Sequence, residues 1–403
     1  MATTGRSTAA PSSPEAIAER LASADFVHVV GHADGDSLAA AGILGKALHH
    51  VEVPLQLSIE DRPQRGEERL SQAEGTVIGL GLGADGEHSG PGALSVSRPP
   101  LATTAHEIAT ALGAEPDPIL ALAGAVAAGS VPGGPPLSEA KDLGVETRPG
   151  LAIPVDDPTD GLVHTGLVHG EFSGSEDATA AFLERLALPE DLPAEDRRRL
   201  ASAVAVSATA APGGTRAAEA IGRAIAPLVI PATSQRGSAQ SSFVASGFRT
   251  VGGIADVLES LSRTDPGRGT SLVLGHGDVT EALEIWRRHN RAVHQELETT
   301  ELTEYDAIAV FEGETADPWT TARLLRDFGT DRPRVLARRD DRIVLATTEA
   351  GAREQLTEAT GRATVGGRPD LAATSVDRPT SEILESIEEK EPQGGAATQG
   401  DSR

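Results

Sequence analysis

The sequence predicts an α/β protein with an N-terminal parallel sheet, a helical linker and a smaller C-terminal α/β domain. Apolar runs alternate with helical repeats from residue 26 to about residue 130, a pattern typical of a parallel sheet covered by helices. Residues 176–228 are mainly helical in period, and a second helix–strand alternation follows a polar linker at 233–242. The 403 residues suffice for two or three domains.

The N-terminal elements follow from the spacing of apolar residues. The expected strands are residues 26–31, 53–60, 76–83 and 93–97, and the expected helices are 37–48, 106–114 and 117–129. Residues 131–150 are rich in Pro and Gly and predict a surface loop, whereas residues 148–174 fit no regular element. Ligands of such sheets collect at the carboxyl ends of the strands, so the loop after residue 31 is the first place to search for a site.

The C-terminal half repeats the alternation with longer helices. The expected helices are residues 255–262 and 279–298, and the expected strands are 270–275, 306–313, 332–339 and 342–348. The whole chain then divides into a disordered leader (1–16), an N-terminal domain (17–175), a helical linker (176–232), a C-terminal domain (233–376) and an acidic disordered tail (377–403).

The charge is strongly acidic. Asp and Glu total 60 against 35 Lys and Arg, which gives a formal net charge of −25. This balance, with few lysines and 2% aromatic residues, is typical of a halophile, where concentrated salt screens the self-repulsion. Without cysteine, neither disulfides nor zinc–thiolate sites can form. The N-terminal residues have no apolar core of the signal-peptide kind, and the sequence has no apolar run of membrane-spanning length, so we expect a cytoplasmic protein that does not bind membranes.

A histidine and two aspartates alternate in the segment VHVVGHADGDSLAAAGIL. His32, Asp34 and Asp36 follow the first expected strand. Alternate side chains of an extended segment point the same way, so the three could converge on a metal ion that activates water. The alternative is that the aspartates cap the helix that begins near Ser37.

The stretch HADGDSLAAAGIL resembles the first motif of the DHH phosphoesterases, in particular their archaeal RecJ-like branch. The order of elements fits as well, so the resemblance covers residues 17–376. It implies a DHH domain, a helical linker and a DHH-associated domain. Active members are manganese-dependent exonucleases or phosphodiesterases, and members without the catalytic residues serve the replicative helicase.

The later family motifs lack their metal ligands in this chain. The resemblance places Gly81 where an aspartate is expected, and Asp85, four residues further on, could replace it only through a shifted loop. The Asp-His-His motif is replaced by Ser97, Arg98 and Pro99, and the fourth motif has Ala128 in place of its aspartate. His32, Asp34 and Asp36 remain, enough for at most one weakly bound Mn²⁺ or Mg²⁺, and no cofactor is required.

Two arginines beside these motifs suggest specific roles. The family's glycine-rich substrate loop corresponds to Gly366, Gly367 and Arg368, where glycines would admit a nucleic-acid phosphate and the guanidinium would bind it. Arg362 lies nearby as a further cation. The alternative is a plain glycine turn. We also expect Arg98 to pair with Asp34 or Asp36 in place of a lost cation.

The expected function is therefore a catalytically inactive, RecJ-like protein of DNA replication or repair. The resemblance implies GINS and MCM as partners, and single-stranded DNA as a further one. One alternative is a manganese-dependent single-strand exonuclease or phosphodiesterase with relocated ligands, and another is a nucleotide or small-molecule sensor that uses the old cleft.

Three other clusters have simpler explanations. His164 and His169 near Glu171 have no fixed geometry for a metal, and the glycine-rich loop at 79–86 lacks dinucleotide-binding spacing. The long helix 279–298 predicts a solvated face with an apolar stripe, which accounts for the polar and aromatic residues on or beside it: Asp278, Trp286, His289 and His294.

Overall fold

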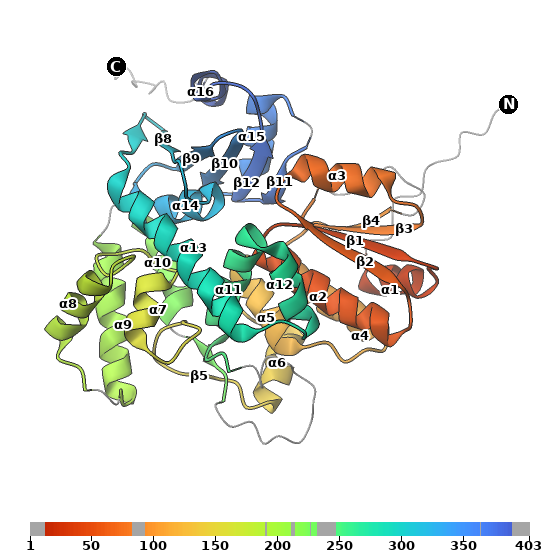
Figure 1. The fold of residues 1–403 in the computed structure, drawn as a ribbon, viewed down its shortest axis with the longest axis horizontal. Coiled ribbons are helices and arrows are strands. Elements are labelled where there is room, and N and C mark those ends of the chain that lie inside the picture. The colour runs from red at the N-terminus through yellow and green to blue at the C-terminus, as the bar shows by residue number, and fades with distance from the viewer. Residues whose placement is uncertain are drawn as a thin grey trace, which may run out of the picture.

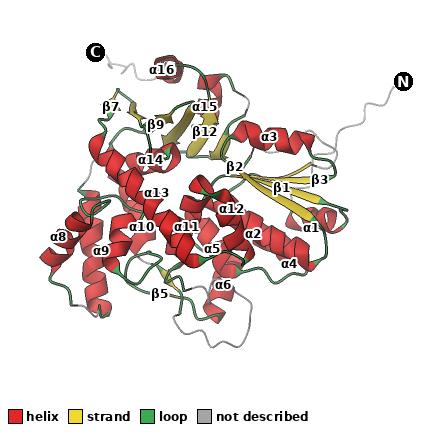
Figure 2. Cartoon of the chain, in the orientation of Figure 1, coloured by secondary structure: helices red, strands yellow, loops and turns green. Residues whose placement is uncertain are grey.

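The computed structural model describes residues 13–82, 93–189, 192–210, 214–225, 227–231, 247–362 and 364–388. Its chain forms two larger sheets with helices packed around them, and a third, two-stranded sheet among the mid-chain helices (Figures 1 and 2). The predicted α/β class is confirmed, and each sheet lies in the half of the chain where the apolar pattern placed it.

The N-terminal sheet has four parallel strands in the order β2-β1-β3-β4. These strands are β1 (Val27–His32), β2 (Leu55–Glu60), β3 (Thr76–Leu80) and β4 (Ala93–Val96). Val27 pairs with Leu55 on one side and with Thr76 on the other, so the carboxyl ends of the strands meet at one edge. The loops after these strands therefore gather there, as expected for a parallel sheet.

Helices of small residues pack closely around this sheet. They are α1 (Pro14–Ala22), α2 (Gly35–His50), α3 (Pro63–Gln72), α4 (Leu101–Ala111) and α5 (Pro118–Ala127). Helix α2 is buried along almost its whole length because Ala and Gly let neighbouring helices approach. A Cβ on Gly42 would lie 2.5 Å from the Cβ of Val273, so this glycine is needed for the contact. Helix α1 begins at Pro14, within the segment expected to be a disordered leader, and residues 1–12 lie outside the described residues.

The middle of the chain is mainly helical, as predicted, with two short strands. Its elements are α6 (Gly134–Asp142), β5 (Glu146–Thr147), α7 (Pro158–His164), α8 (Glu176–Leu186), α9 (Ala194–Thr209), α10 (Gly214–Ile225) and β6 (Leu228–Val229). The prediction of a loop at 131–150 is wrong in part, because α6 forms within this segment. Pro135 and Pro136 lie in the first turn of the helix, where proline is tolerated.

Three helices follow the linker and pack on the N-terminal domain. They are α11 (Val251–Thr264), α12 (Pro266–Leu274) and α13 (Val279–Thr299). The apolar residues of α11 join the same core as those of α2 and α5. The expected domain boundary near residue 233 therefore does not separate two packing units, and α13 leads from this core to the C-terminal sheet (Figure 1).

The strand expected at 270–275 is wrong, because this segment is the end of helix α12. The Asp265 side chain accepts a hydrogen bond from the Arg268 amide, Pro266 begins the helix, and Gly275 ends it in the left-handed region at φ +89°. These are ordinary start and stop signals of a helix. The apolar run TSLVLG is short enough to fit either element by pattern alone.

The C-terminal sheet has six strands in the order β11-β12-β10-β9-β8-β7. Only β8 and β9 are parallel; the other neighbours are antiparallel. The strands are β7 (Thr303–Glu304), β8 (Ile308–Glu312), β9 (Arg334–Arg339), β10 (Arg342–Thr347), β11 (Gly366–Arg368) and β12 (Leu371–Ser375). The helices are α14 (Pro318–Leu324), the π-helix η1 (Leu325–Gly329), α15 (Ala352–Thr360) and α16 (Thr380–Glu388).

Helix α16 lies within the segment expected to be a disordered tail. Ile383 and Leu384 are buried in the same apolar cluster as strand and helix residues of the C-terminal domain. Burial of this apolar face stabilises a segment whose overall composition is acidic. Residues 389–403 of the expected tail lie outside the described residues.

The two sheets are held together by polar contacts along α3. Arg62 makes two hydrogen bonds to Asp341, of 2.8 and 3.1 Å, and Arg342 reciprocates with an ion pair to Asp61. The amide of Gly367 also donates to the Gly81 carbonyl, at 3.3 Å. These contacts bring the C-terminal strand β11 against the carboxyl edge of the N-terminal sheet, where the first motif lies.

Candidate functional site

Asp34 and Asp36 both accept backbone hydrogen bonds at helix N-termini. The Asp34 carboxylate accepts from the Ser37 amide at 2.7 Å and caps its own helix, α2. Asp36 accepts from the amides of Leu101 and Ala102 at 2.7 and 2.9 Å, at the start of α4. Helix α4 has Pro100 at its N-cap and no capping side chain of its own, so Asp36 supplies the acceptor from another element. The capping alternative is therefore confirmed for Asp34, whereas Asp36 lies within α2 and caps α4 instead.

Burial dominates the ionisation of these carboxyl groups. It raises the pKa of Asp36 to about 8, with the neighbouring Asp34 charge as the second cause, and it also raises the pKa of Asp34. The backbone amides and the guanidinium of Arg368 act in the opposite direction on both groups. Desolvation destabilises the charged form, and two acceptor bonds from amides do not offset it at Asp36.

His32 does not point to the same place as the aspartates. Its ring is fully buried, neither ring nitrogen has a hydrogen-bond partner, and its centroid lies 5.1 Å from that of Trp319. Burial, followed by the charges of nearby arginines, holds the pKa of His32 well below its usual range. The expected convergence fails because His32 ends a strand while Asp36 is in the first turn of a helix, and the alternation of an extended segment does not continue into a helix.

The positions of the decayed motifs gather around the two aspartates. A cavity of about 10 Å³ is lined by the following residues: Asp34, Asp36, Gly81, Ser97, Pro99, Leu101, Ala128, Gly367 and Arg368. The structure thus brings together residues that the family resemblance had placed in separate motifs. The volume is that of about one water molecule. Asp85, the proposed substitute ligand, lies outside the described residues.

Arg98 does not pair with the aspartates, so the expected compensation is wrong at this position. Its side chain is exposed, and it does not line the cavity. The cation beside the carboxylates is Arg368, which comes from the C-terminal strand β11. The turn of β4 into α4 directs residue 98 to solvent, whereas the close approach of β11 brings in a guanidinium from about 270 positions further along the chain.

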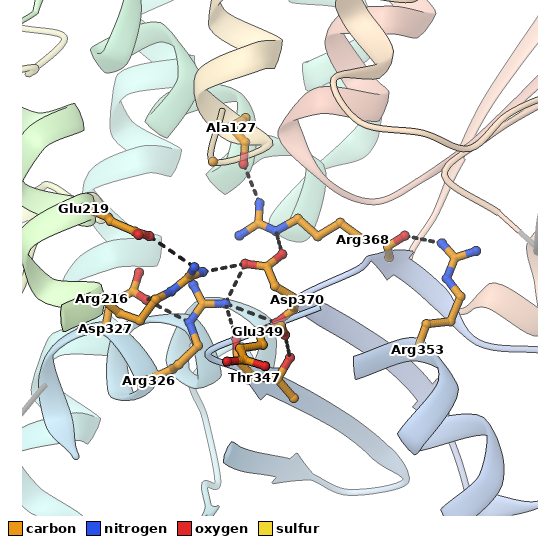
Figure 3. Close-up of polar contacts among 12 residues, drawn as sticks. Ala127, Arg216, Glu219, Arg326, Asp327, Thr347, Glu349, Arg353, Arg368 and Asp370 are labelled. Carbon is orange, nitrogen blue, oxygen red and sulfur yellow. Dashed lines mark hydrogen bonds and ion pairs between the residues drawn. The ribbon is translucent and has the colours of Figure 1, made fainter. Parts of the chain in front are cut away.

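Arg368 is buried and committed to partners within the chain (Figure 3). Its Nη1 donates to the Ala127 carbonyl at 2.6 Å, and its Nε donates to Asp370 at 3.1 Å. Arg353 donates to the Gly367 carbonyl from the other side. Because Nη1 and Nε are bonded within the chain, the guanidinium does not present a pair of free N–H donors to a phosphate. The geometry therefore does not support the expected phosphate-binding role of Gly366, Gly367 and Arg368.

Asp370 connects Arg368 to two more arginines. Arg326 and Arg216 each approach its Oδ2 at 2.8 Å, and Arg326 also pairs with Asp327 at 2.8 Å (Figure 3). Burial would raise the pKa of Asp370, but the three guanidinium groups hold it well below the usual range. We call Arg216, Arg326, Arg368 and Asp370 the arginine cluster.

Glu259 and Arg263 of helix α11 complete the surroundings of the site, although neither was among the predicted site residues. Glu259 accepts from the Gly35 amide at 2.8 Å, and burial followed by the Asp34 charge raises its pKa. Arg263 donates to the Ala33 carbonyl at 2.5 Å and pairs with Asp317 at 3.2 Å. Neither residue belongs to a recognisable motif, so the sequence contained no signal that would have placed them here.

These residues do not fit a two-metal centre. Within the described part of the chain, no group of three or more His, Asp or Glu side chains is arranged to hold a metal ion. Two cations a few ångströms apart need several carboxylate and imidazole ligands, but Gly81, Ser97, Pro99 and Ala128 offer no carboxylate or imidazole at four of the positions. A guanidinium also stands beside the carboxylates that remain.

The other clusters have structural partners. His169 and His294 stack, with their Nδ1 atoms 3.0 Å apart, while His164 faces Asp160 and Trp286. His289 bonds to Thr264 and Thr320, and Asp278 caps α13. The solvated-face interpretation of 279–298 is wrong for His289 and His294, which are buried between α13 and its neighbours, whereas buried Trp286 belongs to the apolar stripe. In the part of the chain that the structure describes, no helix is long and apolar enough to cross a membrane.

Comparisons with known proteins agree with this architecture. No protein-family model matches the chain. The protein rrnAC1427 of Haloarcula marismortui, described as uncharacterised, is 35% identical over 398 residues, which cover 96% of this chain and 100% of that protein. Its source agrees with the salt-adapted composition.

Among solved structures, CDC45 from Entamoeba histolytica superimposes with a TM-score of 0.50 at 9% identity, over 91% of this chain and 95% of that one. RecJ from Thermus thermophilus, in complex with Mn²⁺, gives a TM-score of 0.46 at 14% identity. The match covers 93% of this chain, which spans about half of that RecJ (53%).

Proposed function

The chain belongs to the same family as rrnAC1427 of Haloarcula marismortui and has a RecJ-like DHH fold, and from this premise we propose that it is a non-catalytic scaffold of DNA replication or repair. Its partners would be the replicative helicase proteins GINS and MCM. Similarity in fold to CDC45 supports this choice among the functions of DHH-type proteins.

One observation carries the proposal: the residual carboxylates already have partners that leave no room for two-metal chemistry. Asp36 accepts from two backbone amides, and Arg368 lies beside Asp34 and Asp36 in a cavity of about 10 Å³. Hydrolysis by two cations needs ligands for both ions and an open position for water and the phosphoryl group. The same small volume does not admit a nucleotide, which weighs against the small-molecule sensor.

Two measurements on the full chain test this function. The first incubates the protein with a labelled single-stranded oligonucleotide and manganese in concentrated potassium chloride, beside an Asp36→Ala variant. We expect no cleavage by either protein. Cleavage that the variant loses would establish the exonuclease alternative instead.

The second measurement is a pull-down of purified GINS and MCM from the organism that encodes this chain, with and without a single-stranded oligonucleotide. We expect at least one of the two complexes to be retained by the immobilised chain. Retention of neither would refute the scaffold, and retention of the oligonucleotide alone would leave a single-strand-binding protein.

A further inference from the structure

Three buried carboxylates stand close together at the carboxyl edge of the N-terminal sheet. Asp34 and Asp36 line the small cavity, and Glu259 bonds to the amide of Gly35 between them. The charge of Asp34 raises the pKa of both Asp36 and Glu259. Burying several like charges without a compensating cation is unfavourable, so the fold needs a positive charge at this place.

Arg368 supplies a positive charge that acts on all three carboxylates. It lines the small cavity together with Asp34 and Asp36, and its charge also favours the ionised form of Glu259. It is delivered by the C-terminal domain, on strand β11, while the carboxylates belong to α2 and α11. The contact therefore brings a positive charge to the site and also joins the two sheet-bearing parts of the molecule.

Two hydrogen bonds, one from Nη1 and one from Nε, fix the position of the Arg368 guanidinium. Nη1 is held by the Ala127 carbonyl and Nε by Asp370, which Arg326 and Arg216 hold in turn (Figure 3). A guanidinium held this way keeps its orientation without a ligand, unlike a flexible surface arginine.

The backbone before Arg368 requires glycine. Gly367 has φ +118°, and a Cβ there would lie 2.4 Å from the Leu371 carbonyl and 2.9 Å from the Trp319 ring. The glycine lets β11 approach closely enough to place the arginine. The loop predicted to bind phosphate thus inserts a side chain into the neighbouring domain.

We infer that Arg368 is a built-in cation: its guanidinium takes the electrostatic role of a divalent ion beside Asp34, Asp36 and Glu259, and thereby excludes Mn²⁺ and Mg²⁺ from this pocket. This inference rests on the non-catalytic function proposed above. Removal of the guanidinium would leave Asp34, Asp36 and the Ala127 carbonyl oxygen around an enlarged hole, with Glu259 next to it on the Gly35 amide. Carboxylate, carbonyl and water oxygens are the ligands that Mg²⁺ and Mn²⁺ prefer.

The test compares wild type with Arg368→Ala, Arg368→Gln and Arg368→Lys in concentrated potassium chloride, with and without manganese chloride. Thermal unfolding and isothermal titration are measured on each. We expect the Ala and Gln variants to unfold about 5 °C below wild type, to bind one manganese ion per chain, and to recover part of the loss when it is added. Wild type and Arg368→Lys should show no manganese-dependent shift.

Two controls identify the pocket as the manganese site. Adding Asp34→Asn and Glu259→Gln to the Arg368→Gln variant should abolish the gained binding. Arg378→Ala removes a half-buried arginine that pairs with Glu382 and the Ala359 carbonyl, and it should leave manganese binding absent. The Gln variant keeps a hydrogen-bond donor, so the test survives if the Ala variant does not fold.

The inference is overturned if wild type binds manganese as tightly as the Arg368 variants, or if folded Ala and Gln variants gain no binding. These measurements use the isolated chain and neither substrate nor partner. Their failure is therefore distinguishable from failure of the scaffold function, which the cleavage and pull-down measurements decide.

Discussion

Asp36 lies in the first turn of α2, and Asp370 lies in the turn between β11 and β12. Both carboxyl groups are largely removed from water, but their pKa values shift in opposite directions. Asp36 receives two backbone amides, yet burial and then the Asp34 charge raise its pKa to about 8. Burial acts on Asp370 as well, but Arg368, Arg326 and Arg216 lower its pKa well below the usual range.

The difference teaches what keeps a buried carboxylate charged in this fold. Amide dipoles satisfy hydrogen-bonding capacity, whereas full positive charges within a few ångströms are needed to offset desolvation. Arg368 lies between the two regions and contributes to both (Figure 3). Strand β11 of the C-terminal domain thus supplies a cation to the N-terminal site.

The largest effect is expected from Asp370→Asn, which removes the carboxylate that Arg216, Arg326 and Arg368 share. We expect a loss of about 3 kcal/mol in the free energy of unfolding at neutral pH, measured by urea denaturation in concentrated potassium chloride. The pKa of Asp370 is lowered on folding, so its contribution is present above about pH 4 and is lost as the pH falls below that value. The variant should therefore be less sensitive to acid than wild type.

The matched control is Asp341→Asn, which removes a carboxylate of similar exposure, 28% against 24%, with a single arginine partner. We expect it to cost about 1 kcal/mol or less. Equal losses in the two variants would show that the number of arginines around Asp370 does not matter.

A smaller, pH-dependent effect is expected from Asp36→Asn. Because the pKa of Asp36 is raised on folding, its proton contributes stability that is fully present below about pH 4 and lost as the pH rises through about 8. The melting temperature of wild type should fall between pH 5 and 9 more steeply than that of the variant, in which this group cannot titrate. Parallel curves would mean that Asp36 stays ionised and that the two regions do not differ as described.

The smallest effect is expected from His32→Leu, which exchanges a buried ring for an apolar side chain of similar volume. Neither ring nitrogen has a hydrogen-bond partner, so no bond is lost, and the free energy of unfolding should change by about 1 kcal/mol or less. Urea denaturation with and without manganese measures it. A loss several times larger, or one seen only with manganese present, would restore His32 as a metal ligand and weaken the contrast with the arginine cluster.

The sequence by itself determined the elements that have a local signal. The apolar runs predicted β1 and β2, the 3.6-residue period predicted α2 and α13, and the alternation of the two predicted the α/β class. The family motifs also predicted which distant positions surround Asp34 and Asp36: Gly81, Ser97, Pro99 and Ala128 do line one cavity with them. Periodicity and motif spacing are properties of neighbouring residues, so they can be read before the chain is folded.

Only the tertiary structure decided which side chains become partners. Glu259 meets the Gly35 amide across 224 positions, and Arg368 meets the Ala127 carbonyl across 241. The same packing turned Arg98 to solvent and His32 toward Trp319. Such pairings depend on how closely helices and strands approach, and the small residues at Gly42 and Gly367 set that distance. A charge in a sequence has no fixed partner until packing removes water from around it, and burial then makes the choice of partner energetically decisive.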